Sequence, residues 1–198
     1  MTPSTPHSVS HPEVLVIGYG NTLRGDDAVG YEVAEAIATW NLPHVQALAV
    51  HQLTPELAEA IAPVSTVIFI DAAIPDASTP AAADKTHPIC VESAELGVIM
   101  THLSQSDPSN FTTHVATPNA LLWLVSRLYD AHPTAYQVTI PGICFAIGEK
   151  LSTITVEGKE KALNHLNLAL QEKIDEMKSG CLSPVFISIP DVASRLSE

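Results

Sequence analysis

Two short runs of apolar, mostly β-branched residues constrain the fold of this chain most. Residues 13–18 (EVLVIG) and 66–70 (TVIFI) lack alternating polar residues, which is typical of strands buried on both faces of a parallel sheet. Segments with helical spacing of apolar residues follow them, at 29–40, 117–129 and 156–177. Alternating strands and helices predict a single-domain α/β fold with a mostly parallel, doubly wound sheet of about five strands and helices on both faces. We place this domain at residues 13–180, after a lead-in at 1–12 and before a tail at 181–198.

The charge balance of the chain excludes two classes of partner. Nine lysines and arginines stand against 22 aspartates and glutamates, a formal net charge of −13. A nucleic-acid binder needs a basic footprint that displaces counterions, and anionic lipid repels an acidic surface. We therefore expect no nucleic-acid partner and no membrane partner, and we expect the protein to be a monomer.

The sequence also carries signals about the compartment. No apolar run approaches the ~20 residues of a membrane span, and residues 1–12 have neither the basic residues nor the apolar core of a secretory signal. The three cysteines, Cys90, Cys144 and Cys181, are far apart and form no Cys-x-x-Cys pair. This usage is typical of reduced thiols and excludes a cysteine-ligated zinc cluster. We expect a cytoplasmic protein.

The loop at residues 18–30 (GYGNTLRGDDAVG) is the most informative segment of the chain. It lies between a strand and a helix, but the dinucleotide fingerprint requires a third glycine where this chain has Leu23. The loop also lacks the Gly-Lys-Ser/Thr of a phosphate-binding loop, and its adjacent Asp26 and Asp27 would repel a pyrophosphate. Nucleotide binding is therefore disfavoured. Either aspartate could instead cap the helix N-terminus, although capping requires only one.

Two further polar residues stand where α/β folds place their ligands. Asp71 directly follows the run at 66–70, and His114 precedes the helix at 117–129. The C-terminal ends of parallel strands face the binding crevice, so a sheet order beginning 2-1-3 would bring Asp27 and Asp71 together, with His114 across from them. Two carboxylates and an imidazole can form an open site for a divalent metal. The alternatives are a turn-capping role for Asp71 and an ordinary surface position for His114.

Other chemistries receive less support from the sequence. No Gly-x-Ser-x-Gly elbow occurs and no cysteine stands in an activating motif, so a nucleophilic enzyme is disfavoured. Three classes of protein remain open at this point: a nucleotide-binding regulatory module, a metal-dependent hydrolase of small molecules, and a non-catalytic chaperone. The hydrolase would use the same three ligands with a permanent ion.

The ordered motifs resemble those of the hydrogenase maturation endopeptidases. The first motif resembles the N-terminal signature of that family and reads Gly18-x-Gly20-Asn21-x-Leu23-x-x-Asp26-Asp27-x-x-Gly30. The strand ending in Asp71 and the pair Thr113-His114 resemble the second and third motifs. The segment HQLTPEL at 51–57 looks like a loop variant carried by many members, and the resemblance covers about residues 13–178.

The resemblance implies an endopeptidase that removes the C-terminal extension of a nickel–iron hydrogenase large-subunit precursor after nickel insertion. The family's catalytic metal ligands correspond here to Asp27, Asp71 and His114, acting through a nickel that the substrate carries and the enzyme does not hold permanently. Many members have glutamate at the position of Asp27. Contacts to the substrate are expected from three residues of the first motif and the loop variant, namely Asn21, Gln52 and Thr54. Together with TIPG at 139–142, the HQLTPEL segment is most like members serving uptake-type hydrogenases.

Overall fold

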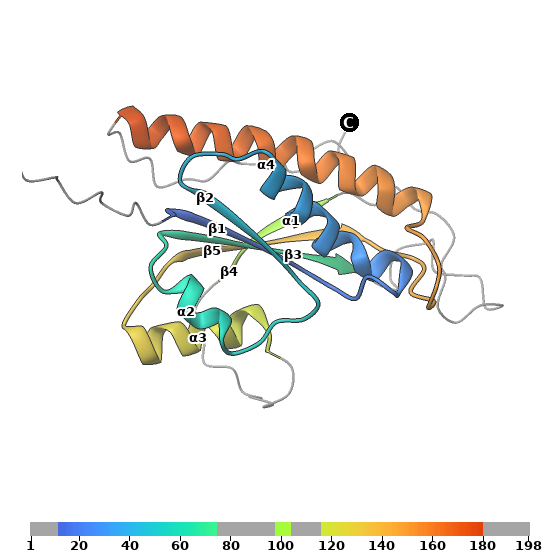
Figure 1. Cartoon of the computed structure of the whole chain (residues 1–198), viewed down its shortest axis with the longest axis horizontal. Helices are drawn as coiled ribbons and strands as arrows, with labels where there is room; N and C mark the ends of the chain where they lie inside the picture. Colours follow the sequence, from blue (N-terminus) through green and yellow to red (C-terminus); the bar gives the residue numbers. More distant parts are fainter. Residues whose placement is uncertain (1–11, 75–97, 104–115, 180–198) are drawn as a thin grey trace, which may run out of the picture.

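The computed structural model describes residues 12–74, 98–103 and 116–179, and the predicted ligand His114 lies outside them. One five-stranded sheet forms the centre, in the order β2-β1-β3-β5-β4 (Figure 1). The strands are β1 (Val14–Tyr19), β2 (Val45–Val50), β3 (Thr66–Ala73), β4 (Ile99–Leu103) and β5 (Thr134–Pro141). All neighbouring strands pair in parallel except β4, which runs antiparallel to β5 at the sheet edge. The predicted α/β class and the predicted 2-1-3 start of the sheet are confirmed.

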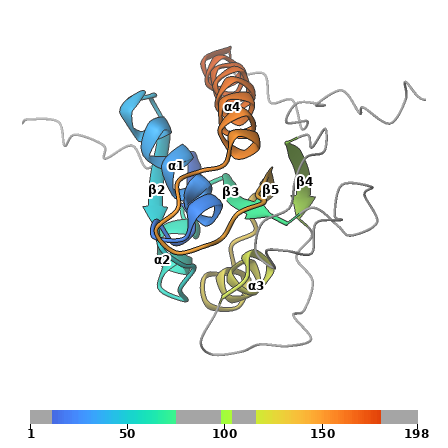
Figure 2. The same ribbon diagram turned by 90° about the vertical axis from the view of Figure 1, so that its right-hand side faces the viewer.

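Helices cover both faces of the sheet, as expected (Figures 1 and 2). The elements α1 (Val29–Thr39) and α4 (Thr153–Ser179) lie on one face, and α2 (Leu57–Ile61) and α3 (Pro118–Tyr129) lie on the other. None of the helices in the described ranges has both the length and the apolar character needed to cross a membrane.

The central strands are buried on both faces, which explains their unbroken apolar runs. Along β1, Val14 and Val16 point into the core beneath α1 and α4, whereas Leu15 and Ile17 point into the core beneath α2 and α3. All four side chains are fully buried. Because neither face has room for a polar residue, polar chemistry is confined to the ends of these strands.

The third strand is longer than the sequence predicts. We expected it to end at Asp71, but β3 continues to Ala73 because its last residues pair with β5, from Asp71 opposite Thr139 onward. Its pairing with β1 stops earlier, at Ile70 opposite Gly18. Asp71 is therefore the first residue of β3 beyond the point where β1 and β3 separate.

Helix α1 approaches the sheet closely because two glycines face each other. A methyl group on Gly18 of β1 would overlap the backbone carbonyl of Gly30, and a methyl group on Gly30 would overlap the carbonyl of Ile70. The glycine pair therefore allows the start of α1, and the short 3₁₀ helix η1 (Gly25–Ala28) that precedes it, to lie directly against the end of β1.

This packing predicts a large difference between two glycine substitutions. Gly30→Ala should lower the free energy of unfolding by about 3 kcal/mol or more, because backbone atoms on both sides cannot move away easily. Gly148→Ala is the control, because open space surrounds that position and only its positive φ of 83° opposes the change. Chemical denaturation of both variants measures the difference, and equal losses would contradict the close approach.

Candidate functional site

The candidate site lies where β1 and β3 separate at the C-terminal edge of the sheet. Asp27 stands on η1, directly after the loop that leaves β1, and Asp71 stands on β3. Both side chains are half-buried. The Asp27 Oδ2 atom accepts a hydrogen bond of 2.9 Å from the Asn21 backbone N–H. The loop is thus folded back so that the Asp27 carboxylate is held beside the end of the strand.

Asp71 is held by two hydrogen bonds in a poorly solvated position. Burial raises the pKa of its carboxyl from 3.8 to about 6, although hydrogen bonds from the Tyr19 hydroxyl and the Ala72 N–H, at 2.8 Å, work in the opposite direction. The charge of Asp27 raises this pKa further, so the two carboxylates lie within electrostatic reach of each other. Burial and the Asp71 charge also raise the pKa of Tyr19, so its hydroxyl stays protonated and can donate to Asp71.

The position of the third predicted ligand, His114, is not described by the structure. Its role therefore stays a prediction. Within residues 12–74, 98–103 and 116–179, no group of three or more His, Cys, Asp or Glu side chains is arranged to hold a metal ion. The structure thus places Asp27 and Asp71 within electrostatic reach of each other, and it does not describe the third residue.

The predicted substrate-binding residues lie in two segments at the same edge, one after β1 and one after β2. The segment between β1 and α1, residues 20–28 with η1 included, is hereafter the first loop. The Asn21 Oδ1 atom accepts a hydrogen bond from the Leu23 N–H at 2.9 Å, so this side chain shapes the first loop. Gln52 is exposed and Thr54 is half-buried in the segment after β2, whose end is joined to the first loop by a bond of 3.2 Å from the Gly20 N–H to the Val50 carbonyl. Contact of these three residues with a substrate stays a prediction.

Asp26 has a role that the sequence did not reveal. We considered helix capping for Asp26 and Asp27, but no side chain caps the N-terminus of η1 or of α1. The Asp26 side chain is fully buried and accepts four hydrogen bonds from residues 117 to 126 positions away along the chain. The donors are the backbone N–H groups of Ile143, Cys144 and Ser152 and the Ser152 hydroxyl.

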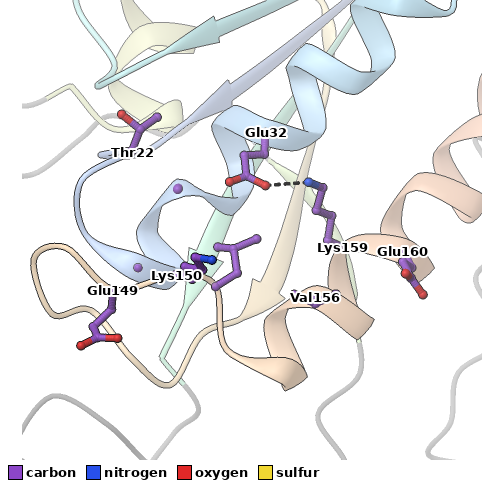
Figure 3. A pocket seen from close by; sticks show the side chains of 10 residues that line it. Thr22, Glu32, Glu149, Lys150, Val156, Lys159 and Glu160 are labelled. Carbon is purple, nitrogen blue, oxygen red and sulfur yellow. Dashed lines mark hydrogen bonds and ion pairs between the residues drawn. The ribbon is translucent and has the colours of Figure 1, made fainter.

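A cleft of about 540 Å³ lies beside the first loop, on the side of α4 (Figure 3). Its walls come from Thr22 and Gly25, from α1 and from the N-terminal part of α4. Glu32 of α1 and Lys159 of α4, which both line the cleft, form an ion pair. Of the predicted site residues that the structure describes, none lines this cleft. These candidate residues at the C-terminal edge of the sheet therefore lie apart from this cleft.

The chain shares its fold with hydrogenase maturation proteases. One neighbour is a maturating endopeptidase from E. coli, with a TM-score of 0.59 and 18% identity over 81% of this chain and 93% of that one. Another is a [NiFe] hydrogenase maturation protease from Thermococcus kodakarensis, with a TM-score of 0.57 and 18% identity over 82% and 93% of the two chains. A third, an endopeptidase from Escherichia coli, has a TM-score of 0.54 and 23% identity over 81% and 93%. No protein-family model and no curated sequence matches the chain.

These neighbours confirm the expected resemblance at the level of the fold. Identities of 17–23% among the neighbours with the higher TM-scores establish a common architecture, while chemistry must be argued from the site. The chemistry of the Asp27 and Asp71 pair suits a cation. Two adjacent carboxylates repel each other when both are ionised, and a divalent ion between them would remove the repulsion and supply what their oxygens lack.

The raised pKa of Asp71 predicts a pH-dependent effect of Asp71→Asn on stability. Between about pH 4 and pH 6 the folded state keeps a proton that the unfolded state releases, so the stability of the wild type falls as the pH rises through that window. The variant lacks this loss. It should therefore be more stable than the wild type above pH 6, by about 1–2 kcal/mol after allowance for solvent screening, and the difference should disappear near pH 4.

Urea denaturation of both proteins at pH 4, 5, 6 and 7 measures this effect. Asp130→Asn is the matched control, because it makes the same change of charge at a fully exposed side chain. A stability difference between wild type and Asp71→Asn that is the same at pH 4 and pH 7 would show that the Asp71 carboxylate is not held in a desolvated position.

Proposed function

We propose that this chain is an endopeptidase that removes the C-terminal extension of a nickel–iron hydrogenase large-subunit precursor after nickel insertion. The observation that carries the proposal is that Asp27 and Asp71 stand where β1 and β3 separate, within electrostatic reach of each other, in a fold shared with hydrogenase maturation proteases. The fold alone would not decide the activity. The coupled carboxylates of Asp27 and Asp71 supply the chemistry.

The nickel is part of the substrate in this proposal. Asp27 and Asp71 would grip the ion with carboxylate oxygens, and His114 would add an imidazole nitrogen, a mixed donor set that suits such an ion. Repulsion between the two carboxylates is relieved when the nickel ion binds between them, and this relief favours binding. The Asp71 carboxyl has a pKa near 6, so a large part of it is already ionised at neutral pH and ready to bind a cation.

The same residues suggest how the peptide bond is cut without a nucleophilic side chain. A substrate held at its nickel by Asp27 and Asp71 has its scissile bond close to the two carboxylates. The ion can polarise the peptide carbonyl or lower the pKa of a water molecule. A carboxylate that is not bound to the ion could accept the proton of the attacking water.

The proposed recognition also acts as a checkpoint. A precursor without nickel offers no cation to the paired carboxylates, so it gains little binding energy at the site and stays uncut. The proposal extends to a monomeric enzyme that acts in the cytoplasm, and it keeps the prediction that the precursor belongs to an uptake-type hydrogenase, which rests on the HQLTPEL and TIPG segments.

The checkpoint predicts that cleavage requires nickel in the substrate. Nickel-loaded precursor should lose its C-terminal extension, whereas empty precursor in the same buffer should stay intact although its scissile bond is chemically unchanged. Intact mass spectrometry over time follows both reactions. Inhibitors directed at serine and cysteine should have no effect. Equal cleavage of the two precursors would favour an ordinary protease or a hydrolase with a permanent metal.

Removal of one carboxylate predicts loss of cleavage in a folded protein. Asp71→Asn keeps the side-chain volume but removes the anionic oxygen that a cation needs, so processing of nickel-loaded precursor should fall below detection. Asp130→Asn, which carries the same change at an exposed position, should cut at the wild-type rate. Circular dichroism establishes that both variants are folded, and wild-type rates in Asp71→Asn would remove this residue from the mechanism.

A further inference from the structure

The loop between β5 and α4, residues 142–152 and hereafter the brace loop, touches both elements that carry the candidate ligands. On one side, its Ile143, Cys144 and Ser152 donate hydrogen bonds of 2.6 to 2.8 Å to the carboxylate of Asp26, the residue beside Asp27. On the other side, the Gly142 N–H donates a bond of 2.8 Å to the carbonyl of Ala73, two residues beyond Asp71.

Backbone bonds join the brace loop and the first loop as well. The Asp26 N–H donates to the Cys144 carbonyl at 2.8 Å, and the Gly148 N–H donates to the Leu23 carbonyl at 2.9 Å. The far end of the brace loop is fixed by Thr155, whose hydroxyl donates to the Pro141 carbonyl at 2.8 Å and contacts the Ser152 hydroxyl at 3.0 Å. The brace loop is thus tied at both ends and along its length.

Only a short carboxylate satisfies the donors at position 26. The Asp26 Oδ2 atom accepts three of the four bonds and Oδ1 accepts the fourth, and an aspartate offers two oxygens that both accept. An asparagine amide in this place would point its own N–H groups either at Ile143 and Cys144 or at Ser152. A longer glutamate would be crowded, because the Asp26 side chain is fully buried and its four donors already lie only 2.6 to 2.8 Å from its oxygens.

We propose that Asp26 is a positioning residue, which fastens the first loop to the brace loop and thereby sets the separation of Asp27 and Asp71. The path runs from Asp27 through its neighbour Asp26 to the brace loop, and from Gly142 through Ala73 to Asp71. Asp26 itself is fully buried, with both oxygens engaged by the brace loop, so it does not touch the substrate. The activity readout of this inference rests on the proposed function, while its structural readout does not.

Hydrogen exchange supplies a readout that does not depend on activity. The Asn21 N–H bonds to Asp27 and the Gly142 N–H bonds to Ala73, and neither group contacts the Asp26 side chain. In Asp26→Asn both amides should exchange at least about 10-fold faster than in the wild type, a loosening of roughly 1.4 kcal/mol. The control is Ile174→Ala in the core under the distant end of α4, which destabilises the protein without touching either loop.

Kinetics with nickel-loaded precursor supply the second readout. A misplaced Asp27 should lower kcat by about 100-fold in Asp26→Asn, in line with the cost of a displacement near 1 Å, and should change KM much less. Ser152→Ala removes one donor to Asp26 and leaves the carboxylate in place, so it should lower kcat by a few-fold in the same direction. This second variant keeps the test valid if Asp26→Asn does not fold.

The outcomes separate the two proposals. Faster exchange at Asn21 and Gly142 in the Asp26 or Ser152 variant, but not in Ile174→Ala, supports the positioning role even if the wild-type protein cuts no precursor, which would overturn only the proposed function. Unchanged exchange at these two amides overturns the positioning role. A wild-type kcat in a folded Asp26→Asn protein, with active wild type as reference, overturns it as well.

Discussion

The site depends on one constraint of the sheet, which is that β1 and β3 are buried on both faces. Side chains of β1 alternate between two apolar cores, and any carboxylate placed along the strand would have to give up its hydration there. Polar groups can therefore appear only where the strands end. The absence of side chains at Gly18 and Gly30 allows α1 and η1 to pack directly against that end. Asp27, which lies on η1, is therefore held next to β3.

The pair of carboxylates at the site lowers the stability of the folded protein, and a bound cation would remove this cost. Asp71 loses solvent and faces the charge of Asp27, and both effects raise its pKa, so an ionised Asp71 costs folding energy at neutral pH. The Tyr19 hydroxyl and the Ala72 N–H offset part of this cost and fix the orientation of the carboxylate. Such a pair is maintained at a cost that a bound cation would remove, and this is the physical argument for the proposed binding of a metal that the substrate brings.

The sequence was sufficient for features set by short-range patterns. The apolar runs at 13–18 and 66–70 predicted two central strands, and the position of Asp71 after such a run predicted a residue at the strand edge. The extension of β3 to Ala73 could not be predicted, because it depends on pairing with β5. The capping role considered for Asp26 was wrong for the same kind of reason. Its partners lie in the brace loop, 117 to 126 residues further along the chain, and no local pattern records them.

Asp26 and Asp27 show how neighbouring identical residues acquire different tasks. On the 3₁₀ helix η1 their side chains leave the backbone in different directions, and each meets a different supply of donors. Asp26 receives four hydrogen bonds in a dry environment, which exhausts its capacity and makes it a structural tie. Asp27 accepts a bond from Asn21 at a half-buried position beside a second carboxylate. The saturated carboxylate is suited to hold protein groups in place, and the less saturated one, for which the described residues supply one hydrogen bond, is suited to hold a cation.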